Sequence, residues 1–376
     1  MRNLFVLAVF FSFTILSCVD KIEVPDSQNS PSLPSQTYDY KSSAVNLRGF
    51  ASGATVEVFH QTNFNSFENP KVTDEGATLG RVLFYDKNLS LNNAVSCASC
   101  HKQEFAFADP VAKSTGFEGR KTIRNSMAVI NSGMNDNLFW DSRASSVVDL
   151  TLQPVVNHLE MGIENMRALE NKLQRLDYYP ELFSKAFGSS EVTEARIASA
   201  MSQFLCSMTS FNSKYDKGEK EKFSNFTELE KLGKEIFFSD RAMCSQCHQG
   251  RNFNAPEQSS DYGGSVKGTA NVGLELVYTD PGKENGKFKI PTLRNIELTA
   301  PYMHDGRFNT LDEVLEHYSH NIQPNPDLDK KFRNPDGSVK HLNFDVIEKK
   351  ALIAFLKTLT DEDYIRDVRF SDPFKS

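Results

Sequence analysis

CASCH, at residues 97–101, is the stretch that decides the architecture of this 376-residue chain, and CSQCH at residues 244–248 repeats it. Two cysteines three positions apart lie on one turn of chain, so each thiol can add to a vinyl group of the same haem. The histidine that follows can then reach the iron as an axial ligand. A zinc site built from the two cysteine pairs is the alternative, but zinc would not require a histidine after both.

The sequence therefore predicts two covalently bound c-type haems. The predicted attachment residues are Cys97, Cys100 and His101 for the first haem and Cys244, Cys247 and His248 for the second. In each set the histidine is the expected iron ligand.

The residues before the two motifs are also duplicated. LGRVLFYD at residues 79–86 precedes the first motif, and LGKEIFFSD at residues 232–240 precedes the second. Each is typical of a short helix that ends in aromatic residues and an aspartate, followed by a loop and the haem-binding turn. Further helical patterns cover residues 165–176, 193–211, 310–318 and 346–359, whereas sustained strand patterns are absent. We predict a mainly α fold of two cytochrome c-like domains, each wrapping one haem in long irregular loops.

The N-terminus has the features of an export signal. An apolar run from Leu4 to Leu16 follows Arg2 and is too short to span a bilayer. ILSC at residues 15–18 resembles a bacterial lipoprotein signal, in which Cys18 would become the lipidated first residue. Ordinary signal cleavage nearby is the alternative. Both interpretations predict export to the periplasm, where c-type haem is attached.

These patterns divide the chain into four parts. We expect a signal peptide at residues 1–17, a flexible tether rich in Ser, Pro, Asn and Gln at 18–45, a first haem domain at 46–220 and a second at 221–376. Residues 46–70 within the first domain have no assigned role. The net charge of −7 favours a basic partner such as a small cytochrome c and disfavours nucleic acid. A homodimer is left open.

Three further segments resemble the bacterial di-haem cytochrome c peroxidase family, which includes MauG. They are FWDSRA at 139–144 with the following Glu160-Met161, IPTLRN at 290–295 and APYMHDG at 300–306. The resemblance covers roughly residues 70–360. It implies a peroxidase in which hydrogen peroxide reacts at the first haem and a small periplasmic donor supplies electrons. A MauG-like oxidase of a partner protein and a non-enzymatic electron-transfer cytochrome are the alternatives.

The resemblance also assigns roles to individual residues. Glu160 lies twenty residues after Trp140, where the family has a catalytic glutamate that moves a proton between the peroxide oxygens. Without the resemblance, Glu160 would be taken for a solvated surface acid. Trp140 would couple the two haems, although a buried core anchor is the commoner role of tryptophan. Asn125, Thr299 and Pro301 would bind calcium, through the side-chain oxygen of the first and the backbone carbonyls of the other two.

Two positions depart from the family pattern near the first haem. Phe117 stands sixteen residues after His101, where members that need reductive activation carry a distal histidine. Phenylalanine cannot bind iron, so the resemblance implies a five-coordinate or water-bound first haem. His60 and His158 are the alternative ligands. Leu150 replaces a distal glutamine and makes this side of the haem less polar.

Tyr318 occupies the position of the second iron's other ligand, which is methionine in standard peroxidases and tyrosine in MauG-like members. Independently of the resemblance, TLDE at residues 310–313 has the pattern of a capping box that opens a helix. Tyr318 shares an apolar face of that helix with Leu311 and Leu315, and His317 and His320 lie off this face. An ordinary core tyrosine is the alternative.

Overall fold

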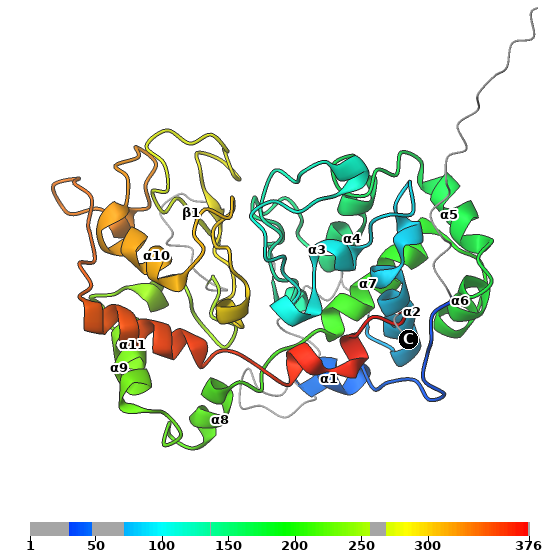
Figure 1. Ribbon diagram of the computed structural model, residues 1–376, viewed down its shortest axis with the longest axis horizontal. Helices are drawn as coiled ribbons and strands as arrows, with labels where there is room; N and C mark the ends of the chain where they lie inside the picture. Colours follow the sequence, from blue (N-terminus) through cyan, green and yellow to red (C-terminus); the bar gives the residue numbers. More distant parts are fainter. Residues whose placement is uncertain (1–29, 47–70, 136, 256–267, 375–376) are drawn as a thin grey trace, which may run out of the picture.

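The computed structural model describes residues 30–46, 71–135, 137–255 and 268–374. Over these residues the protein is mainly helical and folds into two lobes that lie side by side (Figure 1). The expected mainly α class is confirmed, because the strands described are a single pair of two residues each. The expected signal peptide, the proposed acylation site at Cys18 and His60 lie outside the described residues.

The first lobe contains the helices α1 (Lys41–Asn46), α2 (Asp74–Tyr85), α3 (Cys97–Cys100), α4 (Val147–Val156), α5 (Met166–Gln174), α6 (Tyr179–Phe187) and α7 (Glu194–Ser207). The second contains α8 (Lys214–Lys220), α9 (Glu228–Phe237), α10 (Leu311–Glu316), α11 (Val346–Lys357) and the antiparallel strands β1 (Thr269–Ala270) and β2 (Phe288–Lys289). Short 3₁₀ segments join them, and a π-helical segment, η8 (His317–Asn321), follows α10 directly.

The duplicated sequence pattern corresponds to a pair of crossing helices that occurs once in each lobe. In the first lobe α2 packs on α7, and in the second lobe α9 packs on α11. A Cβ atom added to Gly80 of α2 would lie 2.0 Å from the carbonyl oxygen of Ala200, and one added to Gly233 of α9 would lie 1.9 Å from that of Ala351. Both glycines therefore allow two helix backbones to touch where larger residues would hold them apart.

Polar caps explain where these helices begin. Thr73 and Thr193 accept hydrogen bonds from backbone N–H groups in the first turns of α2 and α7, and Thr227 and Asp345 form capping boxes at α9 and α11. The helices expected at residues 165–176, 193–211 and 346–359 are present as α5, α7 and α11 with slightly shorter bounds. The helices α4, α6 and α8 were not expected.

Both ends of the described chain pack on the first lobe, which differs from the expected division of the chain. Tyr40 is fully buried and donates a hydrogen bond from its hydroxyl to the backbone oxygen of Arg369, at 2.7 Å. Tyr364 and Phe370 belong to the same core as Tyr40, so the C-terminal residues return from the second lobe to the first (Figure 1). Part of the expected tether therefore contacts the first lobe, through Tyr40 and through the Ser32 N–H, which donates to the backbone oxygen of Pro373 at 2.7 Å, while most other residues of 30–43 are exposed.

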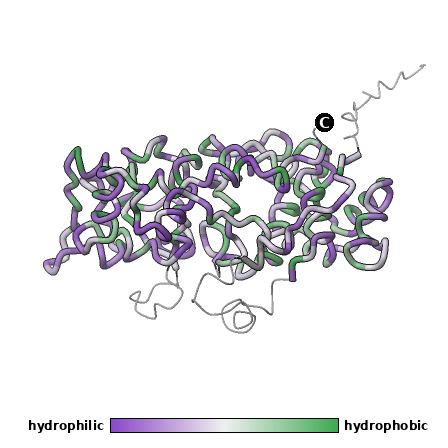
Figure 2. Tube along the Cα trace, turned by 90° about the horizontal axis from the view of Figure 1, so that it is seen from below, coloured by the Kyte–Doolittle hydropathy of each residue, from purple (hydrophilic) through white to green (hydrophobic). Residues whose placement is uncertain are grey.

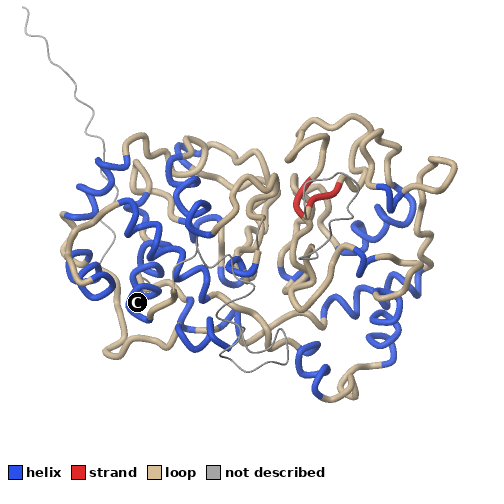
Figure 3. Tube along the Cα trace, turned by 180° about the vertical axis from the view of Figure 1, so that it is seen from behind, coloured by secondary structure: helices blue, strands red, loops and turns tan. Residues whose placement is uncertain are grey.

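The loops gather where the lobes face each other, and the longer helices lie on the outer flanks (Figure 3). Hydrophobic and hydrophilic residues are interleaved along both lobes (Figure 2). Within the described ranges, no helix combines the length and apolarity needed to cross a membrane. The loop-rich centre is the part of the fold that holds the candidate site.

Candidate active site

A continuous cavity of about 610 Å³ connects the two predicted haem positions. Its walls include His101 from the first motif and Cys244, Cys247 and His248 from the second. Most of the remaining lining is apolar, as is usual for a cofactor site. The cavity brings Trp140, Glu160, Tyr318, Asn125, Thr299 and Pro301 together, although the sequence spreads them over nearly two hundred positions.

The two histidines are oriented to offer one ring nitrogen to a metal. His101 donates from Nδ1 to the backbone oxygen of Phe107 at 2.9 Å. His248 donates from Nδ1 to the backbone oxygens of Phe253 and Pro291, both at 3.1 Å. Burial lowers the pKa of both, that of His248 to about 4, so each ring is neutral. A neutral imidazole with Nδ1–H held by a carbonyl leaves Nε2 free to bind iron.

The surroundings of the four motif cysteines favour the neutral thiol. Burial raises the pKa of Cys97 and Cys244 to about 12 and that of Cys100 and Cys247 to about 11. A zinc site needs several ligands close together, and in the described ranges no three or more His, Cys, Asp and Glu side chains are placed to hold a metal ion. The residues present therefore fit thioether attachment of haem better than a zinc site.

Glu160 is held in the cavity wall by the turn that follows α4. Asn157 donates from Nδ2 to Glu160 Oε1 at 2.7 Å, and the backbone oxygen of Glu160 accepts from the N–H of Phe117 at 2.8 Å. Burial raises the pKa of the Glu160 carboxyl, and the charge of Arg143 and the Asn157 hydrogen bond only partly oppose this. Glu160 is thus half-buried in the cavity wall rather than fully solvated.

Phe117 itself is turned away from the cavity. It is absent from the cavity wall, and its ring packs so closely on Gly162 that a Cβ atom added there would lie 2.7 Å from it. Its neighbour Gly116 approaches the backbone of Leu159 and Glu160 in the same way. The segment that in other members would carry a distal histidine therefore supports the Glu160 turn here. His158, the other candidate ligand, is exposed.

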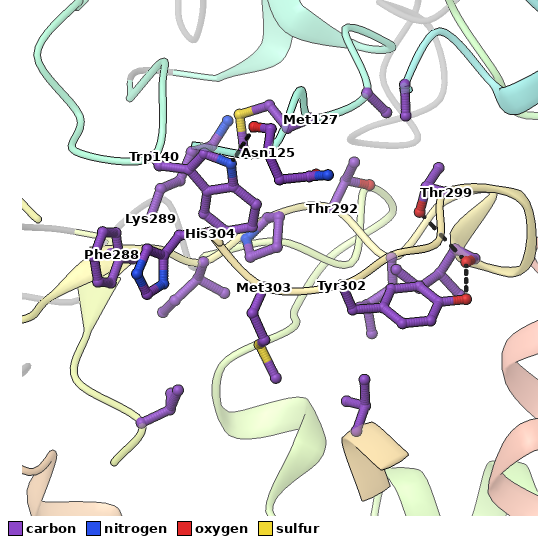
Figure 4. A pocket seen from close by; sticks show the side chains of 18 of the residues that line it. Asn125, Met127, Trp140, Phe288, Lys289, Thr292, Thr299, Tyr302, Met303 and His304 are labelled. Atoms are coloured by element: carbon purple, nitrogen blue, oxygen red, sulfur yellow. Dashed lines mark hydrogen bonds between the residues drawn. The ribbon is translucent and has the colours of Figure 1, made fainter. Parts of the chain in front are cut away.

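Trp140 lies at the junction of the lobes. Its indole donates from Nε1 to the backbone oxygen of Asn125 at 2.9 Å, and its own backbone oxygen accepts from the N–H of Lys289 in the second lobe at 2.7 Å (Figure 4). Next to it, the guanidinium of Arg124 binds Asp141 of the first lobe and Asp280 of the second. Hydrogen bonds across the junction thus fix the orientation of this tryptophan between the two haem positions.

Tyr318 lines the cavity from the π-helical segment η8. Such segments are frequent at functional sites because they turn one side chain out of the regular helical register. The ring stacks on Phe332 with centroids 5.6 Å apart. Burial raises the pKa of the Tyr318 phenol, so its deprotonation would need the charge of a bound metal.

Of the three alternative ligands near Tyr318, the two histidines already have hydrogen-bond partners in the protein. His317 is buried but donates from Nε2 to the backbone oxygen of Val272 at 2.9 Å. His320 is exposed and contacts Glu316 at 2.8 Å. Met303 also lines the cavity (Figure 4). The helix expected over residues 310–318 ends earlier as α10, and the change to π geometry at His317 is what separates these side chains.

The three expected calcium ligands all line the cavity. The backbone N–H of Asn125 donates to the backbone oxygen of His304, and its Nδ2 donates to the backbone oxygen of Val111. Its Oδ1 is therefore available as a metal ligand. The Thr299 hydroxyl donates to the backbone oxygen of Ile296 at 3.4 Å. Amide and carbonyl oxygens are donors that suit calcium. Sequence reasoning missed two other residues of the junction, Arg124 and Lys289, whose surroundings are visible only in three dimensions.

Comparisons with known proteins place this chain among similar proteins. A family model described as di-haem cytochrome c peroxidase matches residues 74–222. Cytochrome c551 peroxidase of Nitrosomonas europaea is 34% identical over 290 residues, which cover 76% of this chain and 80% of that protein. Methylamine utilization protein MauG of Methylorubrum extorquens is 30% identical over 297 residues, covering 78% and 80%.

Solved structures show the same fold. A MauG-like protein associated with microbial copper homeostasis superposes with a TM-score of 0.72 and 31% identity, over 94% of this chain and 99% of that one. The diheme peroxidase BthA from Burkholderia thailandensis superposes with a TM-score of 0.63 at 20% identity, over 80% and 90%, and supports the fold alone.

Proposed function

Because this chain belongs to the di-haem cytochrome c peroxidase family, we propose that it reduces hydrogen peroxide with electrons from a small donor protein such as a cytochrome c. The family consists of haem-dependent oxidoreductases and implies two haems. The observation that carries the proposal is the half-buried Glu160 carboxyl in the wall of the cavity that His101 also lines.

The proposed reaction consumes two electrons and two protons for each peroxide and releases two waters. His101 would hold a haem that supplies the iron for peroxide binding and the electrons for cleavage of the O–O bond. Glu160 takes the proton from the inner peroxide oxygen and delivers it to the outer one, which leaves as water. Asn157 holds the carboxylate oxygen in position for both transfers.

Trp140 is the proposed route for electrons between the haems, and His248 and Tyr318 are the proposed ligands of the second iron. Asn125, Thr299 and Pro301 are the proposed calcium ligands near the lobe junction. Export to the periplasm and a lipid anchor at Cys18 belong to the same proposal. They are supported by the N-terminal sequence, and a c-type haem is attached after export.

Peroxide added to the purified holoprotein, with and without a reduced cytochrome c, tests the activity. Donor oxidation that requires peroxide and reaches many turnovers supports the peroxidase. Peroxide consumption without oxidation of any small donor would contradict it.

A MauG-like oxidase is the second candidate, and Tyr318 is the observation that favours it. A tyrosine ligand stabilises oxidised iron, whereas a methionine favours the reduced state. In this case the oxidising equivalents would pass from the second haem to residues of a partner protein. A spectrum that changes with peroxide and persists in the absence of donor would favour this candidate. A non-enzymatic cytochrome is less consistent with the cavity, because Phe117 offers the first iron no ligand.

A further inference from the structure

Lys289 is a basic side chain that the proposed reaction does not use. It belongs to β2 and lines the cavity between the two haem positions, and its backbone is bonded to that of Trp140 (Figure 4). Among the described residues no carboxylate pairs with its ammonium group, and no hydrogen bond to this group is found. Burial alone lowers the pKa of Lys289 to about 8.

The other basic residues of the cavity wall differ from Lys289 in this respect. Arg124 pairs with Asp141 and Asp280, Arg143 with Asp141, Arg294 with Asp216 and Lys331 with Asp329. Lys289 is half-buried in the cavity wall, and a cofactor in the cavity would remove its ammonium group from water. A charge removed from water in this way is normally paired or bound to a ligand. The Lys289 ammonium group is therefore placed to pair with an anion that does not belong to the polypeptide.

The haems are the anionic groups that this cavity is shaped to hold. A haem carries two propionate carboxylates on the edge opposite its vinyl groups. The cysteines would hold the vinyl groups, so the two propionates would remain as carboxylates that the surrounding protein has to accommodate. We propose that the Lys289 ammonium binds a haem propionate at the lobe junction and forms the ion pair that the protein alone leaves incomplete.

This assignment uses the haems that the family implies and does not depend on peroxide chemistry. It also places an anion close to Trp140. A lone cation beside the indole would oppose removal of an electron from it, whereas a neutral ion pair would not. Lys289 is thus a cofactor-binding residue that also sets the electrostatic environment of the proposed electron route.

The test compares Lys289→Met, which keeps the length and loses the charge, with Lys289→Arg, which keeps the charge. Lys283→Met is the matched control, because Lys283 lies exposed in the same region of the chain. Haem content by mass, resonance Raman spectra of the propionate bending modes and the midpoint potential of each haem are measured on all four proteins without peroxide.

In Lys289→Met we expect two attached haems, a shifted propionate mode and a lower midpoint potential at one haem, because a cation favours the reduced iron. Lys289→Arg restores the mode, and Lys283→Met leaves it unchanged. The haem whose potential falls identifies the source of the propionate. Unchanged propionate modes in Lys289→Met would overturn the proposal. If this variant does not fold, Lys289→Gln provides the same comparison. A protein that fails to turn over peroxide yet shows these shifts would contradict the proposed activity alone.

Discussion

At the scale of single residues, Glu160 shows how burial creates a group suited to proton transfer. The turn after α4 partly buries its carboxyl, which raises its pKa above the ordinary value of 4.5. A carboxylate whose pKa is raised toward the working pH is a stronger base, and its acid form still has a low enough pKa to give the proton back. The neighbouring Phe117 and Gly116 support this turn through the contacts described above.

Glu160→Gln should keep both haems and slow the reaction with peroxide by roughly 10² to 10⁴, the usual contribution of a general acid–base group. Stopped-flow absorption of the haem bands measures this rate. Glu164→Gln is the matched control, since Glu164 is exposed four residues away. A rate equal to that of the parent protein would show that Glu160 takes no part.

The parent protein should also lose rate as the pH falls through a pKa above 4.5, because Glu160 must be deprotonated to accept the peroxide proton. This decline should be missing from the Glu160→Gln profile. A profile with the same inflection in both proteins would assign it to another group.

Tyr318→Met should raise the midpoint potential of the second haem, because a thioether favours reduced iron more than a phenolate does. Axial ligands span about 0.8 V across haem proteins, so the shift should exceed other local effects. Spectroelectrochemistry and low-temperature EPR measure it. Tyr302→Phe is the control, since Tyr302 also lines the cavity but its hydroxyl donates to Ile296. An unchanged potential in Tyr318→Met would leave Met303 as the next ligand to test.

At the scale of the elements, the paired glycines explain why the duplicated helices can cross. The backbone of α9 touches that of α11 at Gly233, as α2 touches α7 at Gly80. The crossing positions the loop that carries each haem motif, because each motif follows the first helix of its pair.

Gly233→Ala should destabilise the protein by about 1–3 kcal/mol or more, since the added methyl group would overlap a backbone oxygen that cannot move away easily. Thermal unfolding followed by circular dichroism and by the haem bands measures the change. Glu235→Ala, at an exposed position of the same helix, should have little effect. Equal melting temperatures for Gly233→Ala and the parent would mean that the helices can separate at no cost.

At the scale of the whole molecule, Arg124 ties the lobes together beside Trp140. Its hydrogen bond is the largest influence that lowers the pKa of Asp280. Burial alone would raise the pKa of Asp141, but Arg124 and Arg143 overcome it and lower that pKa as well. Both carboxylates therefore stabilise the folded state only while they are ionised.

Arg124→Gln should lower stability by about 1–3 kcal/mol, between the values typical of exposed and fully buried ion pairs. The pKa of each aspartate is lower in the folded than in the unfolded protein. Its contribution is thus complete above about pH 4 and disappears as the pH falls through the folded pKa. The difference between the two proteins should shrink accordingly in urea unfolding at decreasing pH. Arg120→Gln, at an exposed pair with Glu118, is the control, and a difference that grows in acid would contradict this account.

The sequence by itself determined those features that arise from residues close together in the chain. The haem motifs, the repeat and the helical periodicity are local patterns, and they predicted two haems, the class of fold and the starts of α5, α7, α10 and α11. The resemblance to the family added Glu160, Trp140 and Tyr318, all of which lie on the cavity wall. Their chemical roles stay predictions.

Only the tertiary structure decided which distant segments meet. It brings the C-terminal residues back to the first lobe, turns Phe117 away from the cavity and places Lys289 on the cavity wall without a carboxylate partner among the described residues. None of these has a local signal, because burial and pairing depend on side chains that are far apart in the chain. A lysine next to a phenylalanine is read from sequence as a surface residue, and only its surroundings show that it needs an anion.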